Sequence, residues 1–258
     1  MLKISTPSGL VFKHSGCMGD TIYSLPVIKY LTKNHPATLF LSTQRLTKKD
    51  DGSPGGYNDD RINVIKPLLE SQKFIKEVRK WHNEYIDYDL DQFRDLFDTP
   101  SNICCWHAQV FNIPTSVCDE KWLEVDPVPI SDIVIAKTAR YKNAEFPWRD
   151  IVKCYKDLIS FVGFPHEHAR FCKDFGEVNF IPTDNLLSLA QIIAGCKLFI
   201  GNQSCPYAIA EGLKVNTILE IYNPLPDCVF NRTNATYNIS EIFLRIGSLV
   251  NSKKIKSL

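Results

Sequence analysis

The sequence predicts an α/β protein made of two similar halves, each built on a parallel sheet. In each half a short apolar segment runs into a polar turn and then a helix: GLVFKH-SGCMGD-TIYSLPVIKYL starts at residue 9, and KLFIG-NQS-CPYAIAEGL starts at residue 197. Another apolar segment follows each helix, and this β-α-β order is typical of parallel sheets covered by helices. The prolines of VDPVPISD, residues 125–132, interrupt both periodicities. We therefore expect domains at 1–128 and 129–258.

The first half opens with an expected strand (9–14), turn (15–20), helix (21–34) and second strand (37–43). The helix is indicated by apolar residues at helical spacing: Ile22, Leu25, Ile28 and Leu31. The charged, glycine-containing segment 47–61 is expected to be an exposed loop, with a functional lid as the alternative.

Segments 61–71 and 75–81 then offer a short strand and helical material, followed by an aromatic-rich stretch at 84–98. We assign its aromatic residues to packing in preference to a sugar-binding platform: Tyr85, Tyr88, Phe93 and Phe97.

The second half is expected to contain a strand at 132–141 and a helix from 146 to about Gly163. A further helix, 182–196, has a Thr-Asp cap before its apolar face, and an amphipathic helix at 239–258 ends the chain.

Composition narrows the class of protein. The 258 residues are 44% hydrophobic and 23% charged, and 30 Lys and Arg against 29 Asp and Glu leave a net charge of +1. This balance gives no general attraction to nucleic acid. No stretch has the roughly 18 apolar residues of a membrane span, and no secretory signal is evident. We expect a cytoplasmic protein with at most peripheral membrane contact and with its nine cysteines reduced.

The two polar turns are the candidate ligand sites, because ligands of open parallel sheets bind where strands end. The glycines of the first turn allow a ligand to approach the backbone, and Asp20 and Thr21 stand where a helix N-cap is expected. Taken alone, Asp20 is either a plain cap or a functional carboxylate. In the second turn, Ser204 is expected as an N-cap or as a hydrogen-bond donor to a phosphate.

Both turns resemble motifs of one family. GDTIYSLPVIKYL, residues 19–31, resembles the Gly-Asp opening of the heptosyltransferase-like glycosyltransferases, the ADP-heptose:lipopolysaccharide family. That family later has Gly-Asn-Asp-Ser-Gly-Pro, a short aliphatic residue and His; this chain has GNQSCPYA at 201–208. The match covers about 13 residues near the N-terminus and about 40 in the second half.

The resemblance implies a GT-B architecture, with two Rossmann-like α/β/α domains facing across a cleft. The second domain would hold a nucleoside-diphosphate sugar, and the first would present a glycan or another hydroxyl acceptor. Asp20 would be the general base. The proposed donor-binding residues are Gly19, Thr21, Arg140, Lys142, Asn202, Gln203, Ser204, Cys205 and Glu211. Glu211 would hold a ribose hydroxyl, a role also considered for Glu220. No metal and no cofactor is expected, since the nucleotide-sugar is a co-substrate.

Three residues depart from the family pattern: Gln203 replaces Asp, Cys205 replaces Gly, and Ala208 replaces His. They leave open an alternative function, a nucleotide or nucleotide-sugar binding protein of the same fold without catalytic activity.

Two groups of Cys and His side chains could instead bind a metal ion. They are Cys104, Cys105, His107 and Cys118, and His166, His168 and Cys172. Neither group has the paired spacing of structural zinc sites. A Cys17–His14 nucleophile is also considered, but nothing else in the sequence marks it.

Overall fold

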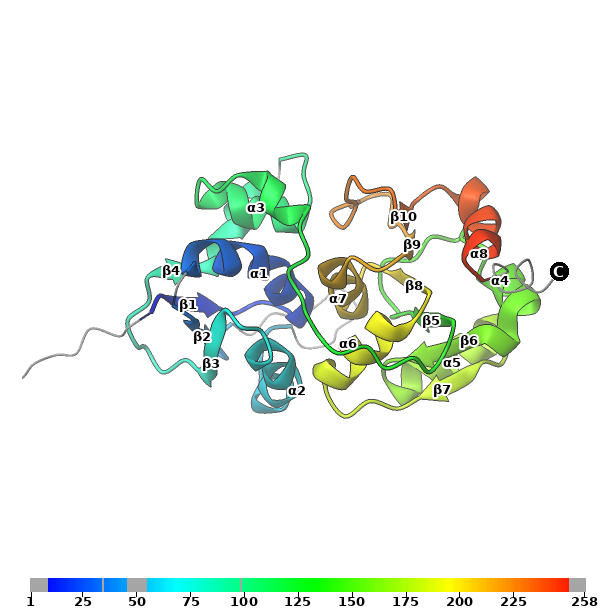
Figure 1. Ribbon diagram of the computed structural model, residues 1–258, viewed down its shortest axis with the longest axis horizontal. Coiled ribbons are helices and arrows are strands. Elements are labelled where there is room, and N and C mark those ends of the chain that lie inside the picture. The colour runs from blue at the N-terminus through cyan, green and yellow to red at the C-terminus, as the bar shows by residue number, and fades with distance from the viewer. Residues whose placement is uncertain (1–8, 34, 46–54, 98, 251–258) are drawn as a thin grey trace, which may run out of the picture. The chain divides into compact units, whose positions relative to one another are not determined.

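A computed structural model describes residues 9–33, 35–45, 55–97 and 99–250. The chain divides into two compact units, Met1–Trp122 and Leu123–Leu258, and each has its own parallel sheet and helices (Figure 1). The α/β class predicted from the sequence is thus confirmed. The division lies before the predicted boundary at 128/129. Segment 123–128 is tied to the second unit, because Leu123 N–H donates to Gly212 O at 3.0 Å and Val128 N–H to Gln191 O at 2.9 Å.

The first unit contains a four-stranded parallel sheet in the order β3-β2-β1-β4. Its strands are β1 (Val11–His14), β2 (Ala37–Leu41), β3 (Ile75–Lys80) and β4 (Tyr88–Asp89). Its helices are α1 (Met18–Thr32), α2 (Asp59–Glu70) and α3 (Ile103–Val110), with 3₁₀ turns η1 (Leu90–Leu96) and η2 (Thr115–Cys118). Helix α1 packs against α3, and α2 packs against β3 (Figure 1). Because β4 pairs with β1, the segments that follow these two strands meet at one edge of the sheet.

Two local predictions for the first unit are wrong. Helix α1 begins at Met18 with Cys17 in the N-cap position, so Asp20 lies within the first turn and is not the cap. Residues 61–70 belong to helix α2 and residues 75–80 to strand β3, the reverse of the expected order. The Asn58 side chain caps the helix by accepting from Arg61 N–H at 2.9 Å. Of the predicted loop 47–61, residues 47–54 lie outside the described residues.

The second unit has a six-stranded parallel sheet in the order β10-β9-β8-β5-β6-β7. Numbered from β5, this is the 3-2-1-4-5-6 strand order of the Rossmann fold. The strands are β5 (Ile133–Ala136), β6 (Ile159–Val162), β7 (Asn179–Ile181), β8 (Leu198–Asn202), β9 (Thr217–Glu220) and β10 (Ala235–Thr236). The helices are α4 (Trp148–Tyr155), α5 (Pro165–Phe175), α6 (Leu186–Gly195), α7 (Cys205–Leu213) and α8 (Ile242–Val250), with 3₁₀ turns η3 (Lys156–Leu158) and η4 (Ile239–Glu241).

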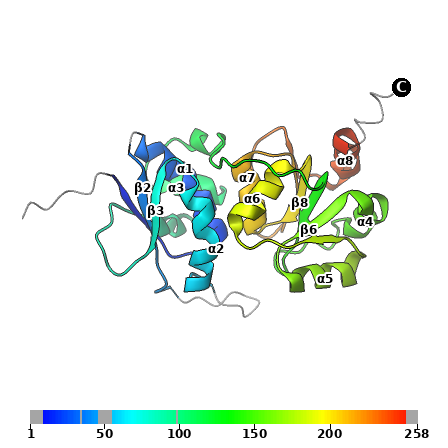
Figure 2. The ribbon, with the colours of Figure 1, turned by 60° about the horizontal axis from the view of Figure 1, so that its bottom comes forward.

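Helices cover both faces of this second sheet (Figure 2). Helices α4, α5 and α8 pack on the face formed by alternate strand residues such as Ile133, Ile135 and Ile200. Helices α6 and α7 pack against each other on the opposite face (Figure 2). The strands are therefore buried on both sides, as their nearly continuous apolar sequences require.

The predicted helix from 146 to 163 is wrong in its second part. Helix α4 ends at Tyr155, and the buried residues Ile159–Val162 form strand β6, because a short, mostly apolar run fits a buried strand as well as a helix. Helix α6 is capped by Asn185, whose side chain accepts from Leu187 and Ser188 N–H, and not by the predicted Thr-Asp pair. Of the predicted last helix, residues 251–258 lie outside the described residues. No described helix has the length and apolar character needed to cross a membrane.

Candidate functional site

In the first unit, a polar cluster forms where β1 and β4 end. The chain continues from β1 into Ser15 and Gly16 and then α1, and from β4 into η1 with Asp91 and Arg94. The strand order reverses between β1 and β4, and such a switch point is where open α/β sheets bind ligands.

Asp91 organises this cluster. Its carboxylate accepts from Ser15 N–H at 3.1 Å and from the Ser15 hydroxyl at 2.6 Å, and it bonds to Arg94. Burial alone would raise the pKa of Asp91, but the hydrogen bonds from Ser15 and the Arg94 guanidinium hold that pKa below its usual value. Asp91 is therefore ionised at neutral pH and fixes the direction of the Arg94 side chain.

Arg94 reaches across the turn to Asp20. Its Nη2 atom lies 3.5 Å from Oδ2 of Asp20, and the Asp20 side chain is 27% exposed. Gly16 makes this approach possible, because a Cβ atom there would lie 2.2 Å from Arg94 Nη2 and 3.1 Å from Asp20 Oδ2. The turn thus presents a partly exposed carboxylate beside a fixed guanidinium.

Two buried histidines lie under the cluster. Burial lowers the pKa of His14 to about 3, and burial also lowers the pKa of His107 far below its usual value. Gly16 N–H donates to His14 Nδ1 at 2.9 Å, so the neutral ring carries its proton on Nε2. The His107 ring stacks on Phe93 with centroids 4.0 Å apart. The cluster therefore combines two uncharged, buried imidazole rings with the charged side chains of Asp91, Arg94 and Asp20.

The structure places the sequence-predicted residues Gly19, Asp20 and Thr21 together in the first turn of α1. Thr21 is fully buried, and its hydroxyl lies 2.7 Å from the Tyr57 hydroxyl. Of these three, Asp20 has the side chain that is both charged and partly exposed. A carboxylate in a first turn is favoured by the helix dipole.

In the second unit, the candidate site forms at the carboxyl ends of three neighbouring strands, β5, β8 and β9. These strands are parallel and in register, with Ala136 opposite Gly201 and Asn202 opposite Glu220. The strand order reverses between β5 and β8, so this is the switch point of the second sheet.

Asn202 is buried and holds the segment after β5. Its Oδ1 accepts from Thr138 N–H at 3.1 Å, and its Nδ2 donates to the Thr138 hydroxyl at 3.2 Å and to Arg140 O at 2.6 Å. The Asn202 amide is used internally, and its effect is to set the path of segment 137–143.

Gln203 is also buried and holds the segment after β9. Its Oε1 accepts from Tyr222 N–H at 2.6 Å, while its Nε2 donates to Leu225 O and to the Asp227 carboxylate, both at 2.7 Å. Ser204 occupies the N-cap position of α7, as expected, but its hydroxyl donates to Asn202 O at 2.9 Å.

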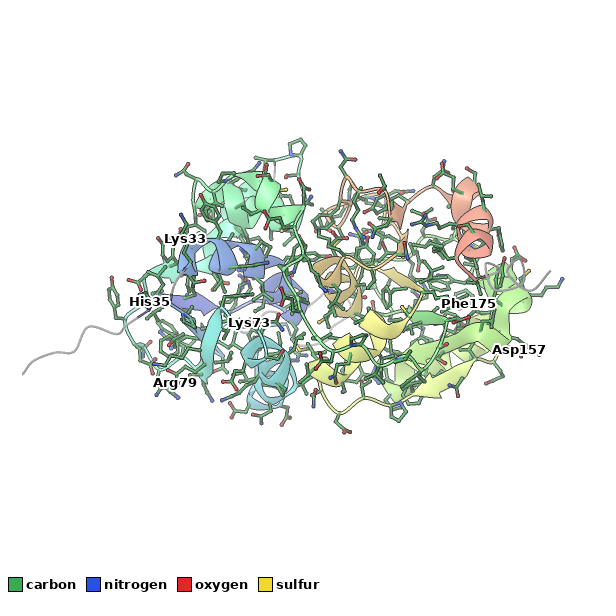
Figure 3. The ribbon with its side chains drawn as sticks, in the orientation of Figure 1. Lys33, His35, Lys73, Arg79, Asp157 and Phe175 are labelled. Carbon is green, nitrogen blue, oxygen red and sulfur yellow. The ribbon has the colours of Figure 1, made fainter. Side chains whose placement is uncertain are left out.

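Glu220 is the centre of a buried ionic contact. It bonds to the Lys137 ammonium and accepts from Asn143 N–H and from the Trp148 indole N–H, both at 2.8 Å. The Lys137 ammonium also lies 5.5 Å from the Trp148 ring centre and 5.9 Å from that of Phe175, which is labelled in Figure 3. Burial lowers the pKa of Lys137, and the Glu220 carboxylate opposes that shift. No role for Lys137 or Trp148 was predicted from the sequence.

Arg140 and Lys142 lie in the segment that Asn202 and Glu220 hold. Arg140 is half-buried and Lys142 is exposed. Helix α7 begins just after strand β8 ends. Its first turn presents backbone N–H groups that make no hydrogen bond within the helix, although Pro206 has no N–H. Cys205 is the first residue of this helix. Positive charge and a helix N-terminus thus adjoin the β5 and β8 ends, the combination that binds phosphate.

Glu211 does not join this site. It lies near the end of α7 and is fully buried, and its carboxylate bonds to Lys214 Nζ at 2.6 Å and to Arg232 Nε at 2.9 Å. Arg232 also binds Val215 O, just before β9. Since α7 runs back from the carboxyl edge of the sheet, these partners place Glu211 toward the opposite edge.

Comparison of the sequence with known protein families and with curated proteins finds no match. Comparison with solved structures does find matches. E. coli heptosyltransferase WaaC with ADP has a TM-score of 0.59 at 10% identity, over 93% of this chain and 99% of that chain. A glycosyl transferase family 9 protein from Veillonella parvula has a TM-score of 0.54 at 11% identity, over 95% and 89%. TibC of enterotoxigenic E. coli, described as a dodecameric iron-containing glycosyltransferase, has a TM-score of 0.56 at 14% identity, over 89% and 62%.

The fold of the chain is similar to that of these solved glycosyltransferases. The similarity extends over nearly the whole chain, including both sheets, whereas the sequence resemblance is confined to two turns. At these identities the likeness establishes the fold alone, and the chemistry depends on the side chains of this chain.

The rival groups of soft ligands are not arranged as metal sites. Within residues 9–33, 35–45, 55–97 and 99–250, no group of three His, Cys, Asp or Glu side chains could hold a metal ion. His168 Nε2 lies 3.2 Å from Cys172 Sγ and 3.0 Å from Val178 O, and burial raises the pKa of the Cys172 thiol. A hydrogen bond with Cys118 and burial raise the pKa of Cys105, so these thiols are protonated and poor ligands or nucleophiles.

The predicted packing role of the aromatic residues at 85–97 applies to three of them. Phe93 is fully buried, Tyr88 stacks on Phe12 with ring centroids 5.2 Å apart, and the half-exposed Phe97 ring contacts the rings of Phe93 and Trp106, with centroids 5.3 Å apart in each pair. Tyr85 is instead exposed.

Proposed function

We propose that this protein is a glycosyltransferase that moves a sugar from a nucleoside-diphosphate sugar to an acceptor hydroxyl, on a glycan, a lipopolysaccharide-type molecule or another polymer. The observation that carries the proposal is the Asp20 carboxylate, partly exposed in the first turn of α1 and 3.5 Å from Arg94. The heptosyltransferase fold and the switch-point position of Asp20 support it.

Asp20 is suited to act as general base. A base must be ionised before the reaction, and both the helix N-terminus and the Arg94 guanidinium favour the ionised carboxylate. In the proposed reaction Asp20 takes the proton of the acceptor hydroxyl while the hydroxyl oxygen bonds to the sugar C1 atom. The bond from C1 to the diphosphate oxygen breaks, and the nucleoside diphosphate leaves with the electron pair.

The second unit would hold the donor. Arg140 and Lys142 would neutralise the diphosphate together with the N-terminus of α7, which supplies N–H groups. These groups stabilise the negative charge that grows on the leaving diphosphate, so the proposed mechanism does not require a metal ion. Transfer requires the donor on the second unit to meet the acceptor held near Asp20, as in the GT-B arrangement expected from the sequence.

The residues that depart from the family pattern all lie in the second unit, which is proposed to bind the donor. Ala208 offers no side-chain donor to the leaving group, so more of the stabilisation falls on Arg140 and Lys142. The Gln203 amide is committed to segment 221–227. The cytoplasmic location stays a prediction.

The test begins with a panel of UDP-, ADP-, GDP- and CMP-sugars screened by thermal shift, followed by transfer assays with the donor that binds. Asp20→Asn should lower kcat by about 10²- to 10⁴-fold, the usual contribution of a general base, with little change in donor affinity. Asp60→Asn, at an exposed position in the first turn of α2, is the matched control and should be fully active. Full activity of Asp20→Asn would contradict the assigned role, and donor binding without turnover by the unmodified protein would favour the inactive alternative.

A further inference from the structure

Two tyrosines meet at the carboxyl edge of the second sheet. Tyr141 lies in the segment after β5 and Tyr222 in the segment after β9, and their ring centroids are 5.4 Å apart with an interplanar angle of 49°. The Arg140 guanidinium lies 4.6 Å from the Tyr141 ring centre. Three planar groups thus gather at this edge of the sheet, and one of them, Arg140, is also a proposed diphosphate contact. Both tyrosines are only half-buried, so the pair is not part of the core.

The end of β8 fixes this pair from both sides. Asn202 donates to Arg140 O, the carbonyl that directly precedes Tyr141, and Gln203 accepts from the N–H of Tyr222. These consecutive buried amides therefore hold the backbone of each tyrosine. Such specific support is what a site needs to keep a binding group in one orientation.

The backbone at Tyr141 is strained. Its φ is +51°, a left-handed conformation that a bulky non-glycine residue adopts at a cost on the order of 1 kcal/mol. Glycine or asparagine would satisfy this turn with less strain. A tyrosine in such a conformation favours a use for its ring, because strained residues often gather at ligand sites.

We propose that Tyr141 and Tyr222 form a stacking platform for the base of the nucleoside diphosphate. This inference rests on the proposed function and adds the residues that recognise the nucleoside end of the donor. Aromatic rings stack on the π-face of any base, and a planar guanidinium beside them adds a cation that faces the same ligand. The adjoining Arg140 charge places the platform next to the diphosphate, as a nucleotide requires.

Isothermal titration calorimetry on the full chain tests this platform, with ADP, UDP, GDP and inorganic pyrophosphate as the probes. Tyr222→Ala should weaken binding of the preferred nucleoside diphosphate by roughly 5- to 150-fold, the range found for loss of one base-stacking ring. Pyrophosphate, which has no base, should bind this variant as it binds the unmodified protein. Tyr222→Phe keeps the ring and should restore nucleotide affinity. Tyr85→Ala removes an exposed tyrosine of the first unit and should change neither.

A second variant separates recognition from folding. Tyr141→Gly removes the ring and relieves the positive φ, so the melting temperature should be unchanged or higher while nucleotide affinity falls by a similar factor. Unchanged nucleotide affinity in both Tyr141→Gly and Tyr222→Ala would overturn the platform and leave the proposed function intact. Loss of affinity for the nucleotide-sugar but not for the nucleoside diphosphate would overturn it too, since the rings would then contact the sugar. Failure of the unmodified chain to bind any nucleoside diphosphate would overturn the proposed function itself.

Discussion

The Nη2 atom of Arg94 lies 3.5 Å from Oδ2 of Asp20, while the other end of the same guanidinium bonds to Asp91. Arg94 and Asp91 both belong to η1, and Asp20 belongs to α1. The ion pair between α1 and η1 exists because β1 and β4 are parallel neighbours. Asp91, with its lowered pKa, keeps Arg94 in place, and Arg94 in turn restrains the carboxylate that we propose as the base.

Substitution of Arg94 should therefore act through Asp20. We expect Arg94→Gln to lower kcat for glycosyl transfer by about fivefold, because a partly exposed ion pair contributes on the order of 1 kcal/mol. Arg94→Lys keeps the positive charge but loses the planar set of guanidinium N–H donors, so its kcat should fall by less than that of Arg94→Gln. Donor affinity should stay unchanged in both variants, since Arg94 is not among the proposed donor contacts. A rise in the donor KM with unchanged kcat would contradict this assignment.

Gly16 is the position at which the first turn tolerates no side chain. A Cβ atom there would lie 2.2 Å from Arg94 Nη2 and 2.6 Å from His14 Cε1. Gly16→Ala should lower the free energy of unfolding by about 1–3 kcal/mol, the usual cost of overpacking, and should reduce activity by displacing Arg94. Gly247→Ala, inside α8, is the control; it should be neutral or stabilising because alanine favours helix. Urea unfolding of both variants measures the difference.

The sequence predicts those parts of the fold that have strong local signals. A glycine-containing turn followed by a long apolar helix identified β1 and α1, and the polar turn at 203–204 identified β8 and α7. Strand β6 was missed because its three apolar residues and one serine follow α4 after a single 3₁₀ turn. Helix and strand cannot be told apart by periodicity in such short runs.

The candidate site was predicted less completely, for a different physical reason. Asp20 and Asn202 stand in recognisable turns, but their neighbours come from other strand ends. Asp91 is 76 residues from Ser15, and Glu220 is 83 residues from Lys137. These contacts depend on the order of the strands in each sheet, which no local sequence pattern encodes. The same limit explains why Gln203 was expected to face the donor, although its amide holds segment 221–227.

Acid should destabilise the first unit through His14. The pKa of this buried ring is lowered from 6.5 to about 3, so between these values the unfolded chain binds a proton that the folded chain does not. Stability contributed by the neutral ring is complete above pH 6.5 and falls as the pH drops toward 3, by roughly 5 kcal/mol in total. His14→Asn keeps an acceptor for Gly16 N–H and should remove about one proton from the slope of unfolding free energy against pH.

The control for this pH effect is His35→Asn. His35 is exposed on the first unit (Figure 3), and an exposed ring is hydrated in the folded and unfolded states alike. The slope measured by urea unfolding between pH 7 and pH 4 should therefore match that of the unmodified protein. The buried His107, whose pKa is also lowered, should leave a residual slope in His14→Asn. An unchanged slope in His14→Asn would show that the His14 proton does not limit acid stability.

Gln203 stands where the family pattern has Asp, and its neighbours explain why Asp would not fit here. The Gln203 Nε2 atom donates to Leu225 O and to the Asp227 carboxylate, both at 2.7 Å. Gln203→Asp would remove both donors and set a second carboxylate near Asp227. We expect a loss of about 1–3 kcal/mol in unfolding free energy, the cost of leaving a buried polar group unsatisfied.

A double variant makes this last prediction specific. Asp227→Asn in the Gln203→Asp background supplies an amide that can donate to the new carboxylate and removes the like charge, so part of the lost stability should return. The same Gln→Asp change at the exposed Gln109 of α3 should cost little by comparison. Unfolding of Gln203→Asp at the same urea concentration as the unmodified protein would mean that the Gln203 amide does not hold segment 221–227. Recovery in the double variant would instead tie the departure from the family pattern to the pairing of Gln203 with Asp227.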